Sequence, residues 1–276
     1  MISRLHIQAA FKSNSTYLKE CYCTQPFKLA DITEDKSGKE LRLMLMSSSP
    51  GILDGDHYQI KIDLEEECSV HLQTQSYQRL FQMKDGASQQ MEVHLAEGAS
   101  LYYLPHPSVP HESSKFTAKN KVFLSPRCTL IWGEVLTCGR KLSGEQFLFS
   151  KYHNHTEIYL CGKLVVKENL LMQPRLVDLT AMGQLEGYTH QATLICLNEV
   201  ASVVDLIKEV NEVLAIEHGL CYGISALPVN GFFVRVMGYK GEQLHNCLRR
   251  IALRLSSLLL QKQDEVNTVK PLVYAG

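Results

Sequence analysis

"VHLAEGASLYY", residues 93–103, is the stretch that decides the fold, because its pattern occurs three times in the chain. The other two copies are "IDLEEECSVHL" (62–72) and "VFLSPRCTLIW" (122–132). Each copy has an apolar residue, a leucine two positions later, a small residue four positions after the leucine, and a further apolar residue. The leucines and small residues are Leu64 and Cys68, Leu95 and Ala99, and Leu124 and Cys128. The copies therefore recur at intervals of 31 and then 29 residues.

Each copy is typical of a strand, a tight bend and a second strand, with the same face apolar throughout. Recurrence at about 30 residues favours a solenoid-like fold of stacked β layers, in which each unit buries its apolar face against its neighbours. We therefore expect Leu64, Leu95 and Leu124 to be buried in neighbouring layers. The alternative is a two-sheet sandwich whose hairpins resemble one another by chance.

Alternation of polar and apolar residues extends this β pattern from the start of the chain to about Met172. Such alternation is typical of half-buried strands. The clearest segments are "ELRLMLM" (40–46), "HYQIKIDL" (57–64), "SVHLQTQ" (69–75), "SQQMEVHLA" (88–96), "KFTAKNKVFL" (115–124) and "CTLIWGEVLTC" (128–138). Short clusters such as "SSSPG" and "KDGAS" separate them, as expected for turns.

Two segments near the end of the chain have helical periodicity instead. "SVVDLIKEVNEVLAIE" (202–217) has one apolar stripe, with Ser202 as its N-cap, and "GEQLHNCLRRIALRLSSLLLQK" (241–262) has a second. Between them, Asn230-Gly231 favours a tight hairpin turn. The sequence thus predicts a single domain over residues 1–276 that is mainly β, with solenoid-like layers and a helix, hairpin and helix unit at 202–262.

The composition excludes several classes of protein. A net charge of −1 gives no bulk field that would attract nucleic acid or an anionic membrane. No apolar run approaches the roughly 20 residues that span a bilayer, and the first residues lack the apolar core of a signal peptide. We therefore expect a cytoplasmic protein. The 9 cysteines include no CxxC pair, and most lie in apolar stretches where a reduced thiol packs as a small hydrophobe.

Common enzyme motifs are missing from the sequence. It contains no GxxxxGK[ST], GxGxxG, GxSxG or HExxH. The stretch "SPGILDGDHYQI" (49–60) is the first place where chemistry could reside, as a metal loop, a phosphate loop or a tight turn. Gly55 can supply a positive φ and aspartate favours turns, whereas a calcium loop needs more oxygen ligands at set spacing. A polysaccharide-acting β-solenoid enzyme with Asp54 and Asp56 as acid and base is one alternative.

Three further clusters have the residue types of binding sites. His153 and His155, and likewise Cys21 and Cys23, lie two apart, so on a strand each pair would share a face and could hold a metal. For neither pair does the sequence reveal a third ligand, and exposed polar residues are the simpler interpretation. In "LPHPSVPHES", three prolines predict a stiff, exposed loop that carries His106 and His111 to a partner.

"GEVLTCGRKLSGE" (133–145) places Glu134, Arg140 and Glu145 around two glycines. One interpretation is a set of surface ion pairs, each contributing well under about 1 kcal/mol. The other is a buried polar cluster, which must be well paired to be tolerated.

Taken in order, these motifs resemble one known family. The small-residue turn of "SPGILDGDHYQIKI", the Thr-Gln of "LQTQSYQRLFQM" and the Leu-Pro of "LYYLPHPSVPHESSKF" are similar to family motifs. So are the Gly-Arg-x-x-x-Gly-Glu of "GEVLTCGRKLSGE" and the entry to a late strand in "GQLEGYTHQATLICL". The chain therefore resembles the urease accessory protein family called UreD or UreH, from about Gln8 to Leu260. It departs from the family pattern at Pro50-Gly51, where Gly-Gly is frequent, and at Asp54, where Gly is usual.

The resemblance implies a non-enzymatic urease maturation factor. Family members bind a helical UreF-type accessory protein and, through it, a nickel-carrying UreG-type GTPase, and the assembly delivers Ni²⁺ to apo-urease. The resemblance also implies a β-rich, solenoid-like fold with two helices, no tightly bound cofactor, Ni²⁺ in transit, and a chain that is dimeric within the complex. A plain interaction module unrelated to metals is the remaining alternative.

Given that role, we expect weak metal ligands, because thiolate or imidazole cages would trap the ion. Asp56, Glu134 and Glu145 are the candidates for a polar passage, and Arg140 belongs to a structural polar cluster. Leu258, Leu259 and Leu260 span about 200° of the helix circumference, so we expect Leu258 and Leu259 to contact the UreF-type partner.

Overall fold

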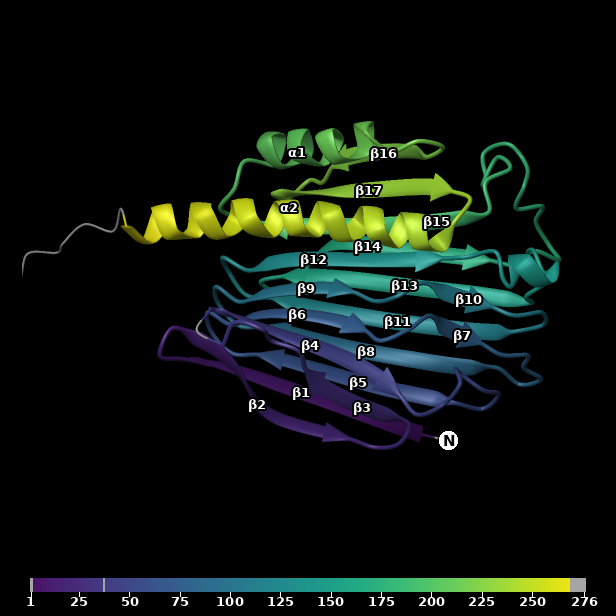
Figure 1. Ribbon diagram of the computed structural model, residues 1–276, viewed down its shortest axis with the longest axis horizontal. Coiled ribbons are helices and arrows are strands. Elements are labelled where there is room, and N and C mark those ends of the chain that lie inside the picture. The colour runs from purple at the N-terminus through teal and green to yellow at the C-terminus, as the bar shows by residue number, and fades with distance from the viewer. Residues whose placement is uncertain (1, 37, 269–276) are drawn as a thin grey trace, which may run out of the picture.

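The fold has three layers, two β-sheets and a layer of helices, stacked as Figure 1 shows. It is seen here in a computed structural model that describes residues 2–36 and 38–268. Within these residues, seven strands form the first sheet and ten form the second. Neither helix of the described residues is long and apolar enough to cross a membrane.

The first sheet has the strand order β14-β13-β11-β8-β5-β1-β2. Its strands are β1 (Ile2–Lys12), β2 (Ser15–Cys23), β5 (His57–Leu64), β8 (Ala87–Leu95), β11 (Lys115–Leu124), β13 (Lys151–Leu160) and β14 (Lys163–Met172). The central pairs are parallel and the two outer pairs, β1 with β2 and β13 with β14, are antiparallel.

The second sheet has the order β16-β17-β15-β12-β9-β6-β4-β3, with β7 and β10 attached beside β12. Its strands are β3 (Phe27–Asp31), β4 (Glu40–Ser47), β6 (Ser69–Thr74), β7 (Gln78–Leu80), β9 (Ser100–Leu104), β10 (Ser108–Pro110), β12 (Thr129–Leu136), β15 (His190–Asn198), β16 (Cys221–Ala226) and β17 (Gly231–Gly238). A short 3-10 helix, Lys141–Ser143, follows β12.

Equivalent positions of the three sequence copies pair with one another in both sheets. Each copy supplies one strand to the first sheet and, after the bend, one to the second. In the first sheet Leu95 pairs with Leu64 on one side and Leu124 on the other, and in the second Ser100 pairs with Ser69 and Thr129. The three leucines are 2–4% exposed, which confirms that they are buried on neighbouring strands.

The bends of the three copies stack in the same way. Glu67, Gly98 and Arg127 all have positive φ, at 60°, 71° and 60°. The Arg127 guanidinium donates to Glu97 at 3.0 Å and to Glu67 at 3.2 Å, so it links one bend to the next. A Cβ on Gly98 would meet Glu67 Oε1, so the flexible Glu67 side chain would have to move, while glycine adopts the positive φ of this bend without strain.

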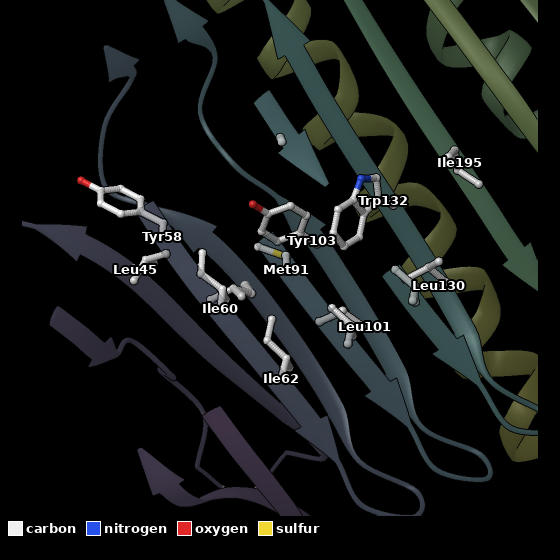
Figure 2. Packing of buried hydrophobic residues seen from close by; sticks show 14 of the residues in the cluster. Leu45, Tyr58, Ile60, Ile62, Met91, Leu101, Tyr103, Leu130, Trp132 and Ile195 are labelled. Atoms are coloured by element: carbon white, nitrogen blue, oxygen red, sulfur yellow. The ribbon is translucent and has the colours of Figure 1, made fainter. Parts of the chain in front are cut away.

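Two apolar cores hold the layers together. The first lies between the sheets; Figure 2 shows part of it, with Tyr58, Ile60 and Ile62 along β5 and Trp132 beside Tyr103. The second lies between the outer face of the second sheet and the helices. Five of the nine cysteines are buried, as expected for thiols that pack as hydrophobes.

The helices lie where the sequence predicts them. α1 spans Val203–Ala215, and the Ser202 side chain caps it by accepting from the backbone N–H of Asp205. α2 spans Gly241–Thr268 and so is longer than expected. β16 and β17 form the antiparallel hairpin between them. The prediction of a mainly β fold with two helices near the C-terminus is confirmed, while its solenoid character stays a prediction.

Candidate functional site

A cavity of about 130 Å³ lies between the two sheets, at the end away from the stacked bends. Both apolar and polar side chains line it. Its polar lining includes Tyr58, Thr74, Gln78, Gln89, Tyr103, His106, Ser108, Asn120, Glu134, Tyr152 and Asn154. The inward faces of the strands thus change from aliphatic near the bends to polar at the cavity.

Glu134, on β12, is the only acidic residue among the described residues that line this cavity. Its Oε1 accepts a hydrogen bond from the Trp132 indole N–H at 3.0 Å. Its Oε2 accepts from the Asn154 amide, and the Asn120 amide approaches Oε1 at 3.5 Å. All three donors are neutral, and no salt bridge of Glu134 is found within the described part of the chain.

Burial raises the pKa of Glu134 from 4.5 to about 7, although its bonds from Trp132 and Asn154 act in the opposite direction. Near neutral pH this carboxyl is therefore close to half-ionised. Glu134 is partly exposed and its hydrogen-bond donors are all neutral, so a cation that entered the cavity would stabilise its ionised form.

Asn120 and Asn154 extend the polar group across the first sheet. The Asn120 amide donates to Asn154 Oδ1 at 3.0 Å and to Thr156 Oγ1 at 2.9 Å, whereas its own Oδ1 is buried without a partner. These asparagines were missed in the sequence analysis. The sequence feature that could have identified Asn120 is a polar residue at a position where the alternation of the strand predicts a buried apolar one. The other such positions of β11 are Phe116, Ala118 and Val122.

Asp54 and Asp56 hold the turn that the sequence predicts before β5. Gly55 has φ of 74°, Asp56 accepts from the Leu53 N–H at 2.9 Å, and Asp54 accepts from the N–H groups of Asp85 and Gly86 at 3.0 and 2.8 Å. Asp56 does not line the cavity and reaches it only through Tyr58, whose hydroxyl donates to Asp56 at 3.4 Å. The Asp56 carboxylate thus closes the turn and does not line this cavity, and its part in a metal passage stays a prediction.

Arg140 and Glu145 form an ion pair of their own. Arg140 Nε donates to Glu145 Oε2 at 2.9 Å, and the same carboxylate accepts from the backbone N–H of Glu112. This pair lowers the pKa of Glu145, mainly through the bond from Arg140. Glu145 does not line the cavity, so the structure separates it from Glu134, and Arg140 belongs to a surface ion pair rather than a buried cluster.

The proline-rich segment is not an exposed loop. Ser108–Pro110 forms β10, which pairs with β7 and β12. His111 is 6% exposed and packs edge-on against Phe81 at 4.8 Å, while His106 is half-buried at the cavity. The prolines favour an extended backbone, and this backbone pairs with the second sheet as β10. His111 is therefore buried and not available to a partner.

The expected partner contact on α2 also changes. Leu259 is 2% exposed and belongs to the second core, so it is already covered within this chain. Leu258 is half-buried and stays a candidate contact, and the side chain of Leu260 lies outside the described residues.

The two residue pairs that could hold a metal gain no third ligand from the described residues. His153 bonds Asn169 at 2.7 Å and His155 lies 3.5 Å from Glu157. Cys21 and Cys23 are exposed neighbours on β2. No group of three or more His, Cys, Asp or Glu side chains that could hold a metal ion is found in residues 2–36 and 38–268.

Comparison with known proteins places this architecture in a family. The model of the family described as "UreD urease accessory protein" matches residues 2–271. A urease accessory protein UreD of Flavobacterium johnsoniae is 51% identical over 256 residues, which cover 92% of each chain. One from Acetivibrio thermocellus is 35% identical over 90% of this chain and 95% of its own, and one from Haemophilus influenzae is 35% identical over 94% and 100%. The chain belongs to the UreD family of urease accessory proteins.

Proposed function

We propose that this chain is a non-enzymatic scaffold that delivers nickel to apo-urease within an accessory complex. Its membership of the UreD family over residues 2–271 is the observation that carries the proposal, because the family's relatives are named as urease accessory proteins. Its partners would be a UreF-type accessory protein, a UreG-type GTPase and apo-urease itself. The chain would act in the cytoplasm and be dimeric within the complex.

The cavity between the sheets is our candidate for the nickel passage. Glu134 offers one carboxylate, and the same cavity is lined by amide, hydroxyl and phenol groups and by one imidazole, that of His106. Oxygen ligands suit a hydrated cation, and a single carboxylate holds a borderline metal weakly enough to release it. Solenoid-like stacking of the repeat units would keep such a passage rigid. The pairing of equivalent positions of the three copies in both sheets supports this stacking.

A polysaccharide-acting enzyme that uses Asp54 and Asp56 finds little support in this geometry. Both carboxylates accept hydrogen bonds from backbone N–H groups, Asp56 within its own turn and Asp54 from the neighbouring turn at Asp85 and Gly86. These bonds, chiefly the one from Gly86, lower the pKa of Asp54, whereas a general acid needs a raised pKa.

Complementation tests the proposal. The chain would be co-expressed with a urease operon that lacks its own UreD-type gene, and urease activity would be measured in the extract. We expect activity well above that of the empty vector. Activity equal to the vector, with the chain present and its UreF-type and UreG-type partners from the same source, would reject the proposed function.

A further inference from the structure

Two histidines from distant parts of the chain meet beside the cavity. His106 lies between β9 and β10, and His245 lies in the first turns of α2. Their ring centroids are 4.5 Å apart with an interplanar angle of 32°. His106 also lines the cavity that contains Glu134.

The contacts of the His106 ring are the basis for assigning its neutral tautomer. The Thr74 hydroxyl donates to the carbonyl of Ser76 at 3.3 Å and lies 3.2 Å from His106 Nδ1. With the hydroxyl proton on the Ser76 side, we assign Nδ1 of His106 as the donor to Thr74 Oγ1, which leaves the lone pair on Nε2. The backbone N–H of His106 bonds the same oxygen at 2.8 Å, which holds the ring in place.

His245 is arranged in the same way. Its Nε2 is buried with no hydrogen-bond partner, and the backbone carbonyl of Leu104 acts to raise the pKa of the ring, so we assign the proton to Nδ1 and the lone pair to Nε2. The residue is only 6% exposed. A buried nitrogen without a partner costs free energy, and this one belongs to a ring whose centroid lies 4.5 Å from that of the His106 ring.

We propose that the Nε2 atoms of His106 and His245 bind one divalent first-row transition ion of the Ni²⁺ or Zn²⁺ class, with water completing its coordination. Neutral imidazole is the usual ligand for these ions, and a second bond from Nδ1 to a protein oxygen is the arrangement that orients a histidine for a metal. Two nitrogen ligands with water leave the ion exchangeable, unlike a four-ligand structural site.

The surroundings bear on the affinity of this site in two ways. Burial lowers the pKa of both histidines, to about 4 for His245, so both rings are neutral at pH 7 and no proton has to leave before the metal binds. Arg249 is a nearby positive charge that acts on both rings, so it opposes a bound cation. Replacement of Arg249 should therefore strengthen binding.

Binding of the metal does not depend on the proposed function. A role as a holding point beside the passage does rest on it, because His106 borders the same cavity as Glu134.

Titration of the full, tag-free chain with Ni²⁺ alone and with Zn²⁺ alone, followed by calorimetry at pH 7.5, tests the site. The background should carry Cys21→Ser and Cys23→Ser, so that the exposed thiol pair does not contribute. We expect one ion per chain, with affinity lowered at least about 10-fold by His106→Asn and by His245→Asn. Arg249→Gln should raise it roughly 5-fold. His94→Asn, on the outer face of the first sheet, is the matched control and should change nothing.

Circular dichroism and the melting temperature of each variant report on folding. If the buried His245→Asn variant does not fold, the half-buried His106→Asn variant carries the test alone. Absence of binding, or binding that both histidine variants retain, would overturn the inference. A chain that activates urease but binds no metal here contradicts only the inference, whereas one that binds metal but fails to activate urease contradicts only the proposed function.

Discussion

Glu134 is an acidic side chain surrounded by neutral donors inside a β fold. Two hydrogen bonds, from Trp132 and Asn154, do not offset the cost of its burial, and its pKa is about 7. The sequence marks Glu134 through the Gly-Glu of "GEVLTCGRKLSGE" but groups it with Arg140 and Glu145, which are near in sequence. Its true neighbours, Asn120 and Asn154, come from other strands, and only the sheet register brings them together.

The raised pKa of Glu134 gives its contribution to stability a definite sign. Between the ordinary pKa of 4.5 and about 7, the folded chain holds a proton that the unfolded chain has lost. The free energy of unfolding must therefore fall as pH rises through this window. In Glu134→Gln this part of the slope disappears, so urea unfolding at pH 5 and pH 8 should show the variant losing about 1–2 kcal/mol less than wild type.

Glu145→Gln is the control for that experiment, since the pKa of Glu145 is lowered rather than raised. Its pH dependence between pH 5 and 8 should match that of wild type. An unchanged slope in Glu134→Gln would show that Glu134 is ionised throughout, and would remove the reason to place a cation beside it.

The stacked bends are the elements that the sequence repeat predicts best. Spacings of 31 and 29 residues fix both sheet registers, because each copy must pair its strands with those of its neighbour. The proline-rich segment and the end of α2 were harder to predict. Neither segment has a sequence period that predicts which part of the chain packs against it. In the structure β10 pairs with β7 and β12, and Leu259 packs in the second core.

Gly98→Ala should destabilise the fold by about 1–2 kcal/mol, since residue 98 has a positive φ of 71° and its new Cβ would displace the Glu67 carboxylate. Glu67→Ala removes the clashing atom but leaves the strained φ. In the double variant we therefore expect part, and not all, of the loss to be recovered in urea unfolding. Equal losses for Gly98→Ala with and without Glu67 would place the whole cost in the backbone.

On the scale of the whole molecule, the two cores join the first sheet to the second and the second sheet to the helices. Leu95 belongs to the first core and lies between Leu64 and Leu124 on the neighbouring strands. Leu95→Ala should cost about 2–5 kcal/mol, because the flanking strands cannot close the space that is left. Leu171→Ala, at a side chain that is 49% exposed, should cost far less in the same thermal unfolding experiment. Similar losses for both would argue against a continuous core.

The nickel content of urease tests the account most directly. Urease would be purified from cells whose operon lacks its own UreD-type gene, complemented with this chain, with its Glu134→Ala variant or with an empty vector, and nickel per active site would be measured by mass spectrometry. We expect the chain to raise nickel content well above that of the vector, and Glu134→Ala to lower it while the accessory complex still assembles in a pull-down. Nickel content that this chain does not raise above the vector would contradict the account.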